Sequence, residues 1–423
     1  MGRNRKSGPG RQRSGSPLIS TCLIAKNEEE FIARSIASAC ELGGEVLIGD
    51  TGSTDGTVAI AKEAGARVFR VTWQDDFAAA KNAVLERARG RWIVFMDADE
   101  WFKAGDARRL RELIEASDQN VRIVGINVYQ TNLQFVDRSD ILDRSKTVRV
   151  FRNCKEHRYL HPIHEQIIQS LTGIVLDTDL ELIHVGFAES VARGKQKSDR
   201  NLRILTQYIE GLSADAPHRR YLLMQRGREY QRLGERQQAK DQYLLAAQDL
   251  LASAIPQQTP FSAILFRYLC EVLMDLREFQ TVLEVCDRFR PWVVFPQADL
   301  YFFEGAAMTE LGRLEEAAQK LLIAISCSEG ADHVQEYGSN HRTVLSYVGA
   351  ARCLRFLGQP LSGYAVAARG LNRFPNSTDL SDEADRCLQM IAPEHRQGAM
   401  EAAQALGSGS DPVGSMPTGS DAP

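Results

Sequence analysis

Long hydrophobic runs are missing from this 423-residue sequence. No stretch approaches the roughly 18 to 20 apolar residues that a membrane-spanning helix needs, and no apolar stretch follows the basic N-terminal segment MGRNRKSGPGRQRSGSP, as a secretion signal would require. The net charge of −4 gives the chain no general attraction to nucleic acid or to an anionic membrane. We therefore expect a cytoplasmic protein with no transmembrane segment and no nucleic-acid partner.

Paired cysteines are also missing. The eight cysteines are widely scattered in mostly apolar surroundings, with no C-x-x-C pair and no spacing that suits zinc. This distribution disfavours a structural zinc site. It indicates buried, reduced thiols in a reducing compartment.

The chain is longer than a single hydrophobic core usually supports, so we expect two folded domains. Near Lys195 the pattern changes from alternating β-rich and amphipathic segments to continuous helical periodicity. We predict a disordered basic arm at 1–17, an α/β domain at 18–195, a helical-repeat domain at 196–392 and a disordered tail at 393–423. The tail ends in GSGSDPVGSMPTGSDAP, which has too few apolar residues to offset the entropy of folding.

Residues 18–128 alternate short β-rich runs with amphipathic segments. The β-rich runs are LISTCLI, EVLIGD, ARVFRV, RWIVFM and VRIVGINV. This order predicts a mainly parallel sheet with helices on both faces. Ligands of such sheets lie beyond the carboxyl ends of the strands, so the polar residues that follow each strand are the candidates for function.

A spaced signature recurs in the second half of the chain. A small residue is followed by Leu-Gly six and seven positions later and by a second small residue five positions further on. The signature occurs at Gly227–Ala239, Gly305–Ala317 and Ala351–Gly363, and in a degenerate form at Cys270–Val282. It resembles tetratricopeptide repeats, in which small residues allow two helices to pack closely and Gly ends the first helix of each pair. We expect these repeats to bind an acceptor molecule, another protein or a second copy of the chain.

The strongest chemical signal is FMDADEW, where a predicted strand runs directly into two carboxylates. Asp97 and Asp99 are two residues apart, so in extended backbone their side chains point the same way. Hard oxygen ligands of this kind suit Mg²⁺ or Mn²⁺. In IGDTGSTDGT, Asp50 ends another strand and could accept a hydrogen bond from a nucleobase, whereas an ordinary turn explains only the residues after it. In AKNEEE, Asn27 is expected to cap the next helix.

Four motifs in order carry a resemblance to a known family: LISTCLIAKNEE, IGDTGSTDGT, WQDDFAAAKNAVLERARG and RWIVFMDADEW. Residues 18–102 resemble family 2 of the glycosyltransferases, the inverting enzymes with the GT-A (Rossmann-like) fold. Within the family they are most similar to the branch with C-terminal tetratricopeptide-like repeats and to lipopolysaccharide-core glucosyltransferases. The resemblance continues to about residue 205 through VRVFRN, IHEQI, IHVGF and KSDRNLRIL.

The resemblance implies a nucleotide-sugar site. It places Ala25 and Glu28 beside the nucleoside, with Lys81 near it, and makes Asp50 a base-recognition residue. Relatives often have Arg at position 81, and Lys keeps the charge but lacks the bidentate fork. Nucleotide identity is therefore less well defined than the class of donor.

The resemblance also implies the residues of the reaction. Asp97 would face the ribose and the metal, and Asp99 would hold the metal directly and so act in catalysis. His184 fits the place of a further metal ligand, with a buried structural histidine as the alternative. Glu165 matches the acidic residue that removes the proton of the acceptor hydroxyl. Apart from the resemblance, Arg149 and Arg152 flank a residue of a predicted strand and are expected to reach the diphosphate or the acceptor, or to form surface ion pairs.

The sequence thus predicts a metal-dependent inverting glycosyltransferase. Its donor would be a nucleotide-diphosphate sugar, with a UDP-linked hexose favoured, and its acceptor a hydroxyl of a glycan, glycolipid or protein. Mn²⁺ or Mg²⁺ would be the cofactor. The alternative is a catalytically inactive repeat scaffold with a vestigial nucleotide-sugar site. A nucleotidyltransferase is disfavoured because LIAKNEEEF lacks the glycine-rich loop that such enzymes use to bind a triphosphate.

Overall fold

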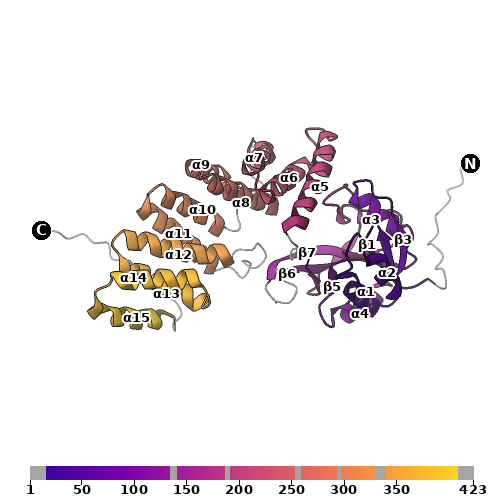
Figure 1. Ribbon diagram of the computed structural model, residues 1–423, viewed down its shortest axis with the longest axis horizontal. Coiled ribbons are helices and arrows are strands. Elements are labelled where there is room, and N and C mark those ends of the chain that lie inside the picture. Colours follow the sequence, from indigo (N-terminus) through magenta and orange to yellow (C-terminus); the bar gives the residue numbers. More distant parts are fainter. Residues whose placement is uncertain are drawn as a thin grey trace, which may run out of the picture. The chain divides into compact units, whose positions relative to one another are not determined.

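The computed structural model describes residues 16–133, 141–185, 191–252, 259–292, 297–329 and 340–407. The chain divides into two compact units, Met1–Leu212 and Ser213–Pro423. Figure 1 shows that the first contains the sheet and the second is built from helices. The boundary predicted after residue 195 falls inside helix α5 (Val191–Glu210), which belongs to the first unit. The helical periodicity starts before the first unit ends, and so it does not mark the boundary between the units.

The first unit is an α/β domain. Its described strands are β1 (Ile19–Ala25), β2 (Glu45–Asp50), β3 (Arg67–Arg70), β4 (Trp92–Phe95), β5 (Glu100–Phe102), β6 (Ile123–Leu133), β7 (Ile141–Arg152), β8 (Ile174–Leu176) and β9 (Glu181–His184). Besides α5, its described helices are α1 (Ile32–Glu41), α2 (Thr57–Glu63), α3 (Phe77–Leu85), α4 (Asp106–Ser117) and the short 3₁₀ helix Ile168–Ser170.

The strands form one mixed sheet in the order β3-β2-β1-β4-β7-β6-β9-β5, with β8 paired to β6. The first four are parallel to one another, as the sequence predicts. β7 runs antiparallel to both β4 and β6, and β5 runs antiparallel to β9. The α/β class is confirmed, and the parallel pattern is limited mainly to the half of the sheet that contains the β1 to β4 motifs.

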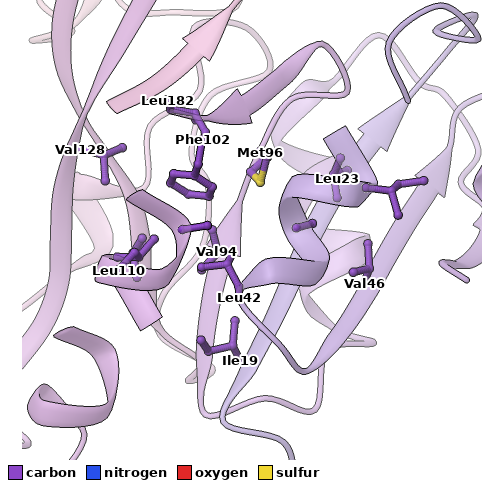
Figure 2. Close-up of a cluster of buried hydrophobic side chains, with 14 of the residues drawn as sticks. Ile19, Leu23, Leu42, Val46, Val94, Met96, Phe102, Leu110, Val128 and Leu182 are labelled. Carbon is purple, nitrogen blue, oxygen red and sulfur yellow. The ribbon is translucent and has the colours of Figure 1, made fainter. Parts of the chain in front are cut away.

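Both faces of the sheet are covered. Successive side chains of the central strands point to opposite faces, and both sets are buried. On one face Leu23 and Val94 pack with apolar side chains of α1 and α4, and Figure 2 shows this cluster. On the other face Cys22 and Phe95 pack with α3. The continuous apolar runs of the sequence follow from this double coverage.

The order of the parallel strands fixes where a ligand can bind. The chain proceeds from β1 outward to β2 and β3, and then returns to place β4 on the other side of β1. Ala25 at the end of β1 is in register with Asp50 at the end of β2, and Asp97 follows β4 directly. This reversal of strand order is where open α/β sheets form their ligand crevices.

The second unit consists of helices. They are α6 (Arg219–Arg232), α7 (Arg236–Ala252), α8 (Pro260–Asp275), α9 (Phe279–Phe289), α10 (Gln297–Glu310), α11 (Leu314–Glu329), α12 (Asn340–Phe356), α13 (Pro360–Arg373), α14 (Thr378–Met390) and α15 (Pro393–Gly407). The four predicted turns join α6 to α7, α8 to α9, α10 to α11 and α12 to α13. The predicted helical class of this half is therefore confirmed.

The small residues of the signature lie where paired helices meet. A Cβ atom on Gly227 of α6 would lie 2.5 Å from the ring of Tyr243 in α7, closer than atoms can approach. The turn residue Gly312 has φ of 75°, and Arg277 takes the equivalent position in the degenerate copy with φ of 60°. The signature therefore encodes one close contact and one left-handed turn in each helix pair.

The predicted disordered tail is wrong in its first part, since residues 393–407 form α15. This helix packs against α13, and Ile391 just before it is 4% exposed. The turn between α14 and α15 has no glycine, and so the spaced signature could not detect α15. Residues 1–15 and 408–423 lie outside the described part of the chain.

All eight cysteines lie in the described residues and are free, and five of them are buried. No helix in the described ranges is both long and apolar enough to cross a membrane.

The left-handed turn gives a stability test. Gly312→Ala should lower the free energy of unfolding of the helical unit by about 1 kcal/mol, because an L side chain is strained at positive φ. No atom lies within 4 Å of the added Cβ, so strain is the only expected cost. Gly398→Ala is the matched control, since Gly398 is exposed in α15 with equally open space and should gain rather than lose stability. Equal effects in urea unfolding of the two variants would contradict this account of the turn.

Candidate functional site

A cavity of about 460 Å³ lies beyond the carboxyl ends of β1 and β4. The predicted site residues that line it are Ala25, Glu28, Lys81, Asp97, Asp99, Glu165 and His184. They come from separate strands, from α3 and from the loop after Tyr159. The fold thus brings together seven of the eight side chains that the sequence singles out, and Asp50 is the exception.

Asp50 shapes the turn after β2. Its carboxylate accepts hydrogen bonds from the backbone N–H groups of Gly52 at 3.2 Å and Ser53 at 3.0 Å. Thr51 donates its own N–H to the carbonyl of Ala25 at 2.9 Å and lines the cavity. Asp50 therefore holds the turn that presents Thr51, and contact between Asp50 and a nucleobase stays a prediction.

Asn27 does not cap a helix, because α1 begins only at Ile32 and no side chain caps it. Asn27 has a positive φ of 59°, and its side-chain oxygen accepts from the backbone N–H of Thr54 at 2.8 Å. The next N–H, of Glu28, donates to the hydroxyl of Thr57 at 2.8 Å. These bonds fasten the loops after β1 and β2 to each other and fix one wall of the cavity.

Lys81 is buried at the centre of the site, with 4% of its surface exposed. Its Nζ lies 2.7 Å from Oε1 of Glu165 and 3.5 Å from Oδ1 of Asp97. Burial disfavours its charge, but Asp97 and Glu165 outweigh burial and hold the pKa of Lys81 above its ordinary value. Lys81 therefore remains charged and links the metal motif to the predicted catalytic base.

Arg149 is the second cation beside Asp97. Its Nη2 donates to Oδ2 of Asp97 at 3.0 Å and to Oε1 of Glu100 at 2.7 Å, and the other Glu100 oxygen accepts the backbone N–H of Asp97. Burial works against ionisation of Asp97, yet Lys81 and Arg149 hold its pKa well below its usual range. Arg149 therefore forms an ion pair, as one of the two alternatives predicts. The arginine is buried and not at the surface, and it orients the carboxylates of Asp97 and Glu100.

Asp99 and His184 meet at the other side of the cavity. Oδ2 of Asp99 lies 3.3 Å from Nε2 of His184, whose Nδ1 is bonded to the side-chain oxygen of Asn132 at 2.6 Å. The antiparallel pairing of Glu100 with His184 in β5 and β9 creates this approach. Although burial disfavours the imidazolium, the bond to Asp99 and the nearby carboxylates raise the pKa of His184 to about 9.

The donor atoms at Asp99 and His184 fit a divalent cation. Two ligands each about 2.1 Å from one octahedral ion lie about 3 Å apart, close to the spacing seen here. Both oxygens of Asp97 instead contact Lys81 or Arg149. In the described part of the chain, no group of three or more His, Cys, Asp or Glu side chains is arranged to hold a metal. Asp99 and His184 are thus the two fitting protein ligands, and direct coordination by Asp97 stays a prediction.

The loop that carries Glu165 is held in place at several points. A bridge pairs Leu160 with Gln166, and the carbonyl of Pro162 accepts the N–H of Phe77 at the start of α3. His161 bonds to the hydroxyl of Tyr208 in α5 at 2.7 Å. Glu165 therefore lies on a loop fixed to two helices of the first unit.

Part of the cavity wall was missed by the sequence interpretation. Lys197, Arg200 and Asn201 of α5 line the cavity, and Arg203 one turn later pairs with Asp75 at 2.8 Å. The available signal was KSDRNLRIL, in which basic residues recur at helical spacing. The family resemblance extends through this segment, whereas the helical periodicity assigns it to the second domain.

Comparisons with known proteins found a matching family model and several relatives. Residues 20–170 match the family model described as Glycosyl transferase family 2. A TPR repeat-containing protein of Synechococcus elongatus is 27% identical over 281 residues, which are 64% of this chain and 65% of that protein. The SPbeta prophage-derived glycosyltransferase SunS of Bacillus subtilis is 27% identical over 208 residues, 47% of each chain. The chain thus spans less than two-thirds of each relative.

A solved structure also matches in part. Glucosyl-3-phosphoglycerate synthase from Mycobacterium tuberculosis, in complex with Mn²⁺, uridine-diphosphate and phosphoglyceric acid, is 26% identical over 28% of this chain and 44% of that chain, with a TM-score of 0.24. A TM-score of this size supports no structural argument. The family 2 resemblance is confirmed by the family model and the relatives, whereas similarity to lipopolysaccharide-core glucosyltransferases stays a prediction.

The buried ion pairs give a second stability test. Arg149→Met should lower the free energy of unfolding by about 1–3 kcal/mol at neutral pH, because it removes the hydrogen bonds of Arg149 to Glu100, which is fully buried, and to Asp97, which is partly exposed and keeps Lys81. Burial already raises the pKa of Glu100 to about 7 with the arginine present. Loss of the arginine raises the pKa of both carboxyls in the folded state, so the deficit should shrink as the pH falls and they become protonated.

The matched control is Arg111→Met, which removes an arginine whose side chain is 49% exposed and paired at the surface with Glu115, itself 50% exposed. Its melting temperature should stay near that of the wild type. A deficit in Arg149→Met that is small, or that grows towards acidic pH, would contradict the assigned role of Arg149.

Proposed function

We propose, from the match of residues 20–170 to the family model described as Glycosyl transferase family 2, that the protein transfers a sugar from a nucleotide-diphosphate donor to an acceptor hydroxyl. The observation that carries the proposal is the meeting of Asp99 and His184 with the Lys81–Glu165 pair in one cavity. The favoured donor is a UDP-linked hexose. A cytoplasmic location, and binding of a partner or a second copy by the helical unit, remain parts of the proposal.

The donor is proposed to occupy the cavity of about 460 Å³. Ala25, Glu28 and Thr51 would flank the nucleoside, and Lys197 and Arg200 of α5 would approach the diphosphate as cations. Asp99 and His184 would hold Mn²⁺ or Mg²⁺, which supplies positive charge to the leaving diphosphate. The negative charge of the diphosphate and the positive charges of Lys197 and Arg200 support this placement.

Glu165 is proposed to act as the base. The acceptor oxygen attacks the anomeric carbon, the bond from that carbon to the diphosphate oxygen breaks with its electron pair, and Glu165 takes the hydroxyl proton. The 2.7 Å contact with Lys81 orients the carboxylate of Glu165. Attack from the face opposite the leaving group inverts the anomeric centre.

Donor binding tests the proposal. UDP with Mn²⁺ at about 100 times its dissociation constant should stabilise the wild-type protein by about 2.7 kcal/mol, seen as a thermal shift. In Asp99→Asn this shift should be lost or strongly reduced, because a metal ligand loses its charge. GDP and dTDP in parallel identify the base.

The control is Asp179→Asn, since Asp179 is 75% exposed and lies outside the cavity. It should keep the full shift. If no nucleotide stabilises the wild type with or without metal, the proposal is wrong and the inactive repeat scaffold replaces it.

The base gives a separate test. Glu165→Gln should lower kcat by about 10²–10⁴-fold while the nucleotide-induced thermal shift is retained, because only proton removal is lost. Glu156→Gln, an exposed position in the preceding loop, is the control and should keep wild-type kcat. Undiminished kcat in Glu165→Gln would exclude Glu165 as the base.

A further inference from the structure

A second cavity of about 510 Å³ adjoins the first. Its wall is formed by side chains of β6 and β7, by Tyr159 and by residues 165–168. Lys81, Asp97 and Glu165 line both cavities. The two spaces therefore meet at the ion pair between Lys81 and the proposed base.

The positions of the two cavities indicate which substrate each one binds. An inverting transfer needs the base next to the acceptor hydroxyl, with donor and acceptor approaching from different sides of the reacting carbon. Asp99 and His184 line only the first cavity, so the diphosphate belongs there. Glu165 lines both, which leaves the second cavity for the acceptor.

Side-chain amides are prominent in the wall of the second cavity. Asn127 donates its amide N–H to Asp177 at 2.8 Å, and Gln130 donates to Glu100 at 2.8 Å. The side-chain oxygen of Gln166 accepts from Gln169. The side-chain oxygens of Asn127 and Gln130 and the side-chain NH₂ group of Gln166 have no hydrogen bond to the described residues. The wall thus offers two carbonyl acceptors and one NH₂ donor.

Two buried polar atoms of the same wall also lack partners. The hydroxyl of Tyr159 and Nε of Arg149 have no hydrogen-bond partner among the described residues, although these residues are only 5% and 7% exposed. Leaving such groups unbonded costs about 1–3 kcal/mol each. A ligand that carries several hydroxyl groups would satisfy them, since each hydroxyl both donates and accepts.

We propose that the second cavity binds a pyranose ring of the acceptor, through Asn127, Gln130 and Gln166, so that one ring hydroxyl lies at Glu165. This assignment rests on the proposed glycosyl transfer. An alkyl chain would bury the amide atoms without partners. A serine or threonine side chain would fill little of a cavity within the size range of ligand pockets. The acceptor is therefore a glycan or the sugar part of a glycolipid.

The binding experiment uses the full chain without donor. Saturation-transfer NMR is recorded with methyl glucopyranoside, galactopyranoside and mannopyranoside, and with a peptide that contains serine and threonine. At least one pyranoside should give a signal, and the peptide should neither bind nor compete. Binding of the peptide alone would overturn the proposal and assign the cavity to a protein acceptor.

Two variants locate the bound sugar. Asn127→Ala and Gln166→Ala should each weaken the binding pyranoside at least tenfold, and should raise the acceptor KM more than they lower kcat. The thermal shift with UDP and Mn²⁺ should stay unchanged, because neither side chain lines the first cavity. Gln119→Ala, an exposed site after α4, is the matched control and should bind as the wild type does.

The outcomes separate the inference from the function on which it rests. Nucleotide binding without any pyranoside signal, or pyranoside binding unaffected by both variants, overturns the acceptor assignment alone. Pyranoside binding that the variants weaken, together with failure of every nucleotide, supports the sugar site but refutes the transferase.

Discussion

The partly exposed carboxylate of Asp97, held between the buried cations Lys81 and Arg149, is the interaction on which the site depends. Buried cations are stable only when carboxylates accompany them, and these two cations come from α3 and β7. Glu100 completes the group by binding both Arg149 and the backbone N–H of Asp97. Strand β4, its antiparallel neighbour β7 and the helix on one face of the sheet are thereby fixed to one another where the reacting groups gather.

This ion-pair group also separates two chemical tasks. Lys81 binds Glu165 on one side, while Asp99 faces His184 on the other, so the proposed base and the proposed metal ligand Asp99 each have a separate basic partner. The first cavity then combines carboxylates with cations from α5, as a metal-diphosphate group requires. The second shares Lys81, Asp97 and Glu165 with the first, and adds amide and hydroxyl groups that can bind the hydroxyls of a sugar. The difference in chemistry between the two walls is the basis for assigning a different substrate to each.

The helical unit follows simpler rules. Each predicted pair depends on a small residue at the helix contact and a left-handed residue at the turn, as Gly227 and Gly312 show. Arg277 takes the left-handed conformation without glycine, so the pattern tolerates one strained copy when helix packing supports it. Helices α14 and α15 have no such signature; each packs against α13, and Leu380 in α14 and Ile391 just before α15 are buried.

The sequence by itself determined the features that depend on neighbours along the chain. Strand ends rich in carboxylates located Asp97 and Asp99, turn residues located the helix pairs, and the family motifs pointed to Glu165 and His184. Only the tertiary structure decided that Arg149 is buried beside Asp97, that α5 lines the first cavity and that Asp50 orders a turn without lining that cavity. The physical reason is that charge pairing and cavity walls join residues far apart in the chain, and local periodicity carries no information about such contacts.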